Sequence, residues 1–142
     1  MIRQEVTDGW IIYDPLFVRH SLADNYFSYL QQNLPWRGGE IKLFGKVHQI
    51  PRKQVMMANQ GLSYAYSGKT LESESWDDQV IQIKSQIEDA TGYTFNACLA
   101  NLYRDGQDSN GWHADNEKEL GENPIIASVS FGATRKFQLK HN

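Results

Sequence analysis

His113 and Asp115 stand one residue apart in a stretch rich in Gly, Asp, Ser and Asn, NLYRDGQDSNGWHADNE (residues 101–117). On an extended backbone, side chains two residues apart point to the same side, so this imidazole and this carboxylate can converge on one metal ion. Two histidines and one carboxylate on one face of an octahedron are the usual ligands of non-haem Fe(II) oxygenases, and they leave positions open for a cosubstrate and dioxygen. The spacing therefore indicates a metal site as one interpretation.

The His-x-Asp pattern has little specificity when it is taken alone. Composition gives about one chance in four that such a pattern occurs in a chain with these numbers of His and Asp, which favours a surface turn. Asn101 and Tyr103 favour the metal site, because both fall on one face of a strand shortly before His113, where polar side chains need partners. A bound carboxylate ligand would supply those partners, and a buried structural hydrogen bond would do so equally well.

The composition predicts a single globular domain. A chain of 142 residues that is 40% apolar and 22% charged is long enough to bury one core and is not typical of disorder. The apolar runs are too short to cross a membrane, and the N-terminus lacks the apolar core of a signal peptide. The single cysteine, Cys98, cannot form an internal disulfide, which favours a reducing, cytoplasmic location.

The charge is distributed unevenly along the chain. The net charge is -3. Residues 37–53 contain five Lys or Arg against one Glu, a local charge of +4, whereas residues 72–89 contain six acidic residues against one Lys, a local charge of -5. A basic face for a polyanion would explain this asymmetry, although a solvated surface is the simpler interpretation of charge alone.

The expected elements follow the order of an α+β domain. Apolar spacing predicts one helix over 21–34 and another from Ser75 to Gly92, opened by a capping box of Ser75 and Asp78. Alternating apolar residues predict a hairpin over 41–50, a strand that carries Tyr64 and Tyr66, and strands over 10–13, 95–103, 125–131 and 135–141. A jelly-roll-like double sheet is the closed form that such strands favour.

Several motifs in one order resemble the AlkB family of Fe(II)- and 2-oxoglutarate-dependent dioxygenases. The first is N-x-Y-x-D-G-x-D-x-x-G-x-H-x-D-x-E at 101–117, followed by PIIASVSFGATRKFQLKH. The earlier stretches LFGKVHQIPRKQ and GLSYAYSG also resemble this family, in particular the branch that acts on duplex DNA. The resemblance covers roughly Phe44 to His141. It implies a double-stranded β-helix core and the removal of alkyl groups from nucleic-acid bases.

The resemblance implies a cofactor site. His113 and Asp115 would be two iron ligands, and Asn101 and Tyr103 would hydrogen-bond 2-oxoglutarate. Iron and 2-oxoglutarate would activate dioxygen to hydroxylate an N-methyl group on 1-methyladenine or 3-methylcytosine. Succinate and carbon dioxide would be released, and the hydroxylated product would lose formaldehyde to give the repaired base.

The resemblance also implies a nucleic-acid surface. Phe44, beside Gly45 at the hairpin tip, would be the wedge that fills the gap left by a flipped base, and Arg52 would contact nucleic acid near the lesion. The residues that would line the base pocket are Tyr64, Tyr66 and Glu117. An inserted apolar side chain restores part of the stacking that flipping removes, and a basic stretch around it would hold phosphates. Without the resemblance, Phe44 is more typical of a core strand residue.

The chain departs from the family pattern after His113 and Asp115. The third iron ligand, a downstream histidine, and the R-x-N-x-x-x-R motif whose first arginine pairs with 2-oxoglutarate are both absent. His141 ends the RKFQLKH strand, where the family has a histidine that is not a ligand. We therefore expect a jelly roll that lacks its last strands, and a 142-residue chain that does not turn over by itself.

The resulting prediction is a single domain, with an N-terminal extension over 1–92 that carries the helices and the recognition hairpin, and the first part of the core over 93–142. We expect a monomeric Fe(II)- and 2-oxoglutarate-dependent demethylase of N-alkylated bases in DNA. Two alternatives stay open: a catalytically inactive nucleic-acid-binding module, and a related dioxygenase that acts on RNA or on another substrate.

Overall fold

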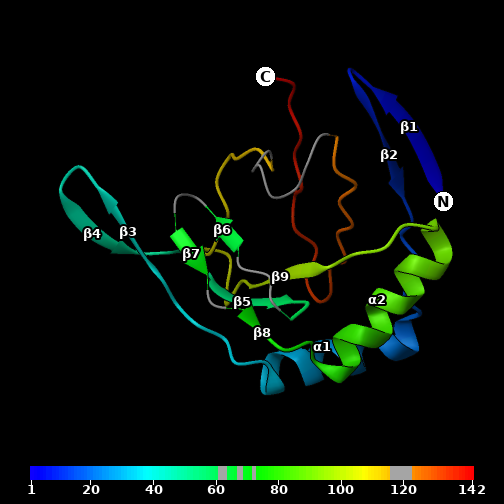
Figure 1. Ribbon diagram of the computed structural model, residues 1–142, viewed down its shortest axis with the longest axis horizontal. Helices are drawn as coiled ribbons and strands as arrows, with labels where there is room; N and C mark the ends of the chain where they lie inside the picture. Colours follow the sequence, from blue (N-terminus) through cyan, green and yellow to red (C-terminus); the bar gives the residue numbers. More distant parts are fainter. Residues whose placement is uncertain (61–63, 67–68, 72, 116–122) are drawn as a thin grey trace. The chain divides into compact units, whose positions relative to one another are not determined.

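Figure 1 shows the computed structural model, which describes residues 1–60, 64–66, 69–71, 73–115 and 123–142. In the segments 64–66 and 69–71 the description covers the backbone. The chain divides into two compact units, one formed by residues 1–32 with 129–142 and the other by residues 33–128. All the predicted site residues belong by number to the second unit.

The first unit contains a hairpin and a helix; the helix and the second strand of the hairpin confirm the sequence predictions, whereas the first strand was not predicted. Strands β1 (Ile2–Val6) and β2 (Gly9–Tyr13) pair in antiparallel fashion, as Figure 1 shows, and α1 spans His20–Asn33. Tyr26 is the buried residue of this helix, and its ring centroid lies 5.8 Å from that of Phe131. The residues after 128 in this unit are therefore held by packing against α1.

The strands predicted over 125–131 and 135–141 are absent, because the structure assigns no strand anywhere in 123–142. The imidazole of His141 instead donates a hydrogen bond to the carboxylate of Asp8, with 2.8 Å between nitrogen and oxygen. An alternating apolar pattern becomes a strand only where a neighbour supplies backbone donors and acceptors. None of the described strands is paired with these two segments, so the prediction of strands there is wrong.

A three-stranded sheet forms the centre of the second unit. Strand β5 (Lys53–Ala58) lies between β8 (Ser73–Glu74), which is parallel to it, and β9 (Ala97–Leu102), which is antiparallel. Four consecutive β5 residues are buried: Val55, Met56, Met57 and Ala58. The sequence predicted β9 but not β5, because a run of four apolar residues with two methionines is too short and too weak in β-propensity to identify a strand. Burial on both faces is what a central strand requires.

Two further hairpins belong to this unit. Strands β3 (Glu40–Leu43) and β4 (Lys46–Gln49) confirm the predicted hairpin and are joined by Phe44 and Gly45, both with positive φ (51° and 77°). Positive φ at both central residues defines a type I′ turn, which matches the twist of its strands. The second hairpin joins β6 (Tyr64–Tyr66) and β7 (Lys69–Leu71).

Helix α2 (Asp78–Thr91) begins at a different cap from the one predicted. Asp77, not Ser75, is the N-cap, and its carboxylate accepts hydrogen bonds from the backbone N–H groups of Gln79 (2.9 Å) and Val80 (3.2 Å). Aspartate caps as well as serine does and adds a negative charge at the positive end of the helix dipole. The predicted end is confirmed, because Gly92 adopts a left-handed conformation and its N–H donates to the carbonyl of Glu88.

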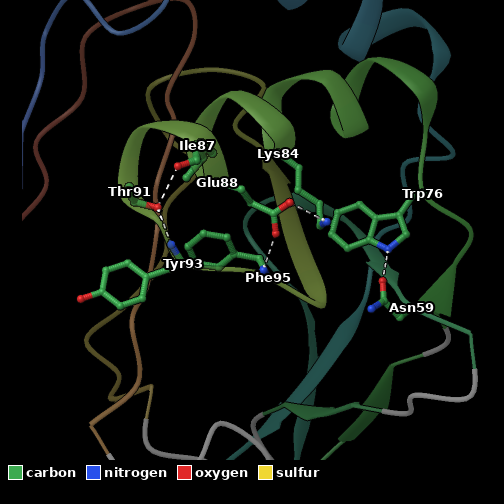
Figure 2. A network of polar contacts seen from close by, with 8 residues as sticks. All are labelled: Asn59, Trp76, Lys84, Ile87, Glu88, Thr91, Tyr93 and Phe95. Carbon is green, nitrogen blue, oxygen red and sulfur yellow. Dashed lines mark hydrogen bonds and ion pairs between the residues drawn. The ribbon is translucent and has the colours of Figure 1, made fainter.

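Figure 2 shows that Glu88 joins the end of α2 to the segment that enters β9. One carboxylate oxygen accepts from the ammonium of Lys84 (3.1 Å) and the other from the backbone N–H of Phe95 (2.8 Å). The Lys84 ammonium lies 5.5 Å from the ring centroid of Trp76, whose indole N–H donates to the side-chain oxygen of Asn59 just after β5. These contacts set α2 against one end of the β5–β9 pair, where Ala58 lies opposite Ala97.

The hydrogen bond from Phe95, followed by that from Lys84, holds the pKa of Glu88 below its usual range. We expect Glu88→Gln to lower the free energy of unfolding at neutral pH. A lowered pKa means that Glu88 stabilises the fold at pH values above the ordinary carboxyl pKa of 4.5. That contribution is lost as the pH falls through the folded-state value.

The difference between wild type and Glu88→Gln, measured by urea unfolding, should therefore shrink from neutral pH towards pH values of about 3. Asp89→Asn changes the neighbouring exposed carboxylate and serves as the matched control. An equal destabilisation by both variants, or a pH-independent effect of Glu88→Gln, would contradict this role.

Candidate metal and nucleic-acid site

His113 and Asp115 converge, as their spacing predicted. Nε2 of His113 lies 3.5 Å from Oδ1 of Asp115, and the side chains are 37% and 40% exposed. Nδ1 of the same ring lies 2.8 Å from the carbonyl oxygen of Gly111. Since a carbonyl only accepts, Nδ1 carries the proton, and a neutral ring then presents the lone pair of Nε2 towards the carboxylate. Two lone-pair donors that face each other favour a cation between them.

This donor set fits an iron ion in part. Adjacent ligands of an octahedral ion with bonds near 2.1 Å are separated by about 3 Å, close to the observed gap between His113 and Asp115. A backbone carbonyl on the distal ring nitrogen is also the usual second partner of a metal-binding histidine. Among the residues that the structure describes, however, no group of three or more His, Cys, Asp or Glu is placed to hold a metal. His141, the one downstream histidine, belongs to the other unit, where its Nε2 donates a hydrogen bond to the carboxylate of Asp8.

Asn101 lies in β9 opposite Gln54 of β5. Its side-chain oxygen accepts a hydrogen bond from the amide of Gln54 (3.1 Å), and both backbone groups of Gln54 are bonded to Arg37. The structural hydrogen bond that the sequence left open as an alternative is thus present on the oxygen. It also orients the carboxamide, so its NH2 group is the part that can donate to a carboxylate. Tyr103 follows directly after β9 and is half-buried.

The loop between Tyr103 and His113 contains a residue that the sequence did not single out. Asp108 is the one polar or charged residue found buried in the described part of the chain, at 7% exposure. It pairs with Arg104, with 2.7 Å between Nε and Oδ2. The signal in the sequence was an Arg and an Asp four residues apart inside a Gly-rich stretch, which is too common to indicate a role.

Phe44 is fully exposed, with a relative accessibility of 103%. It stands at the tip of the β3–β4 ribbon seen in Figure 1, beside Gly45 and between strands that carry Lys42 and Lys46. Val47, on the same hairpin, is also mostly exposed. The hairpin thus presents an aromatic ring flanked by cationic side chains, and the core-strand alternative for Phe44 is wrong.

Arg52 stands between the hairpin and the metal-ligand loop. Its Nη1 donates to the carbonyl of Ser109 (3.3 Å), and the N–H of Ser109 donates to the carbonyl of Pro51 (2.8 Å). The Nε of Arg52 is buried and has no hydrogen-bond partner in the described structure.

The remaining predicted residues concern the base pocket. Tyr64 and Tyr66 lie in β6, where their backbones pair with Leu71 and Lys69. Their side chains, like the whole of Glu117, lie outside the described residues. Cys98 is half-buried in β9, and burial raises the pKa of its thiol to about 11, which makes it an unreactive packing residue. In the described part of the chain, no helix is long and apolar enough to cross a membrane.

Comparison with known proteins identifies the family of the chain. Residues 11–142 match the model of the 2OG-Fe(II) oxygenase superfamily. The chain is 41% identical over 122 residues to human DNA oxidative demethylase ALKBH2, covering 84% of this chain and 47% of the relative. It is 41% identical over 127 residues to the bovine alpha-ketoglutarate-dependent dioxygenase alkB homolog 3 (89% and 44%). The relative from Arabidopsis thaliana, named DNA oxidative demethylase ALKBH2, is 39% identical over 136 residues (92% and 43%).

The chain spans about half the length of these relatives. The family uses Fe(II), 2-oxoglutarate and dioxygen, and its members have a jelly-roll core, with which the small sheets and two helices described above are consistent. The match extends over most of the chain and includes every predicted site residue. This chain belongs to the 2OG-Fe(II) oxygenase superfamily and, within it, to the AlkB family.

Proposed function

We propose that this chain is part of an oxidative demethylase that repairs N-alkylated bases, such as 1-methyladenine and 3-methylcytosine, in DNA. The observation that carries the nucleic-acid substrate is the fully exposed Phe44 in a left-handed conformation at a basic hairpin tip. A bulky residue with positive φ costs about 1–3 kcal/mol and persists mainly where function requires it. Exposing a phenyl ring to water adds a second cost.

His113 and Asp115 would bind the iron through Nε2 and a carboxylate oxygen, with Gly111 orienting the imidazole. Asn101 would donate its amide to 2-oxoglutarate from the orientation that Gln54 imposes, and the Tyr103 hydroxyl would donate beside it. When bound, the iron would let dioxygen oxidise two groups together: 2-oxoglutarate would become succinate and carbon dioxide, and the N-methyl group would become a hydroxymethyl group, which leaves the base as formaldehyde.

The β3–β4 hairpin would separate the target base from its stack. Phe44, supported by the tight turn at Gly45, would occupy the vacated space in the duplex, while Lys42 and Lys46 would neutralise phosphates on either side. A methyl group that blocks Watson–Crick pairing lowers the cost of flipping, which favours damaged bases. Arg52 would contact the nucleic acid near the lesion, beside the metal-ligand loop to which its Nη1 is hydrogen-bonded at Ser109.

Tyr64 and Tyr66 would line the base pocket, with Tyr66 stacking on the flipped base, and Glu117 would lie at the polar edge of the base. These three roles rest on the match to the family motifs. We further propose a monomer in a cytoplasmic, reducing compartment.

A second candidate is a nucleic-acid-binding module without turnover in these 142 residues. It is favoured by the presence of only two metal ligands at the site among the described residues. A related dioxygenase that acts on RNA is a variant of the first proposal. Succinate and formaldehyde release by the full-length gene product, compared on methylated duplex DNA, single-stranded DNA and RNA, separates these functions. No release on any of them would overturn the demethylase.

We expect His113→Ala and Asp115→Ala each to weaken Mn(II) binding by the 142-residue chain by about 10-fold or more, because each removes a ligand. Mn(II) is a redox-stable substitute for Fe(II), and its binding is measured by electron paramagnetic resonance of the free ion. His141→Ala is the control and should leave the affinity unchanged, because His141 is bonded to Asp8. A loss of affinity in His141→Ala equal to that in His113→Ala would show that the ligand set has been assigned wrongly.

We expect Phe44→Asn to keep or raise thermal stability and to weaken binding to a duplex containing 1-methyladenine. Asn-Gly is the favoured pair for a type I′ turn, so the change relieves backbone strain while it removes the ring. Binding is measured by fluorescence anisotropy, and base flipping by a 2-aminopurine opposite or beside the lesion.

Val47→Ala is the matched control, because it truncates another exposed apolar side chain of the same hairpin. Loss of affinity in both variants would indicate general apolar contact, and unchanged affinity and flipping in Phe44→Asn would remove the wedge from the proposal.

A further inference from the structure

The Asp108 carboxylate organises the loop that precedes the metal-ligand pair. Its Oδ2 accepts from the backbone N–H of Arg104 (2.9 Å) and from Nε of the same residue (2.7 Å), while Oδ1 accepts from Nη2 (3.1 Å). The side chain of Asp108 is 8% exposed and that of Arg104 49%. Burying a carboxylate is costly unless such donors compensate it. A backbone donor and a guanidinium fork supply that compensation here.

The same loop is fixed at its far end. Ser109 donates its N–H to the carbonyl of Pro51 and accepts from Arg52, as described above. Lys53 and Leu102, the adjoining ends of β5 and β9, are partners in the sheet. The loop therefore leaves the sheet where β9 ends, closes on itself through Arg104 and Asp108, and is tied at Ser109 to the segment where β5 begins.

His113 follows four residues after Ser109, through Asn110, Gly111 and Trp112. A glycine-containing segment of this kind can adopt many conformations and does not fix the position of His113 by itself. The anchored residues before it must therefore restrict where the His113 side chain lies. The hydrogen bond from Nδ1 of His113 to Gly111 is local and can form only if the backbone at Gly111 presents its carbonyl to the ring.

We propose that Asp108 is a positioning residue for the metal-ligand pair. By binding Arg104, Asp108 holds the loop so that the carbonyl oxygen of Gly111 accepts a hydrogen bond from Nδ1–H of His113. The Nε2 atom of His113 then faces Asp115. This inference rests on the proposed function only in that the pair binds a metal. If Asp108 stabilised only the turn over residues 104–109, substitutions of Asp108 would change that turn and leave the tautomer of the His113 ring unchanged.

The direct test is the tautomer of His113 in the metal-free 142-residue chain. Long-range proton–nitrogen NMR at a pH of about 8, where imidazoles are neutral, reports which ring nitrogen carries the proton. In the wild-type chain the Nδ1–H form should predominate. In Asp108→Asn, which keeps the shape and removes the charge, the ring should shift towards the Nε2–H form that free imidazole side chains favour.

The second readout is Mn(II) affinity, which should fall by about 10- to 100-fold in Asp108→Asn, as is typical when a group that orients a metal ligand is lost. Glu5→Gln is the matched control, because Glu5 forms an exposed ion pair with Arg3 (2.8 Å) in the other unit. It should change neither readout. Arg104→Lys keeps the positive charge but loses the planar fork, and it replaces Asp108→Asn as the deciding variant if the latter fails to fold.

An unchanged tautomer and unchanged Mn(II) affinity in a folded Asp108 or Arg104 variant would overturn the proposal. A shifted tautomer in the variant supports the positioning role of Asp108, whether or not the wild-type chain binds Mn(II). Absence of Mn(II) binding by the wild-type chain would count against the metal site and not against the positioning role. The two failures are therefore distinguishable.

Discussion

The antiparallel pairing of β5 with β9 is the interaction on which the described site depends. Six residues of each strand are in register, from Lys53 opposite Leu102 to Ala58 opposite Ala97. Its apolar half is buried through four consecutive β5 residues, and burial at about 25 cal/mol per Å² is the main stabilising contribution available to a small unit. One end of this ladder leads directly into the loop before His113, and the other end packs against α2.

At one end, the sheet determines how the polar residues are placed. The Gln54–Asn101 pair is a cross-strand contact, so the amide orientation of Asn101 follows from the register. Beyond Leu102 the chain enters the loop that Asp108 and Ser109 hold, and His113 with Asp115 lie past it. At the other end, Glu88 and Trp76 set α2 against the sheet, which keeps the pairing in place. Site geometry and fold stability therefore depend on the same pair of strands.

The β3–β4 hairpin follows a different physical logic. Its tip accepts backbone strain at Phe44 and exposes the ring completely, both of which oppose stability. Asparagine would suit the turn better. A stability cost at a basic, exposed tip is what a nucleic-acid probe requires, because the ring must leave water only when it enters the duplex.

The sequence by itself determined the family, the His-x-Asp pair, the hairpin with Phe44 at its tip, and both helices, because these depend on local spacing and turn chemistry. It did not predict β5, the Asp77 cap or the absence of strands over 125–131 and 135–141. A strand exists only with its partners, and a cap depends on which of several acids reaches the free N–H groups. Only the tertiary structure decided that Gln54 orients Asn101 and that Asp108 is buried against Arg104, since residues distant in sequence or folded into a loop set those contacts.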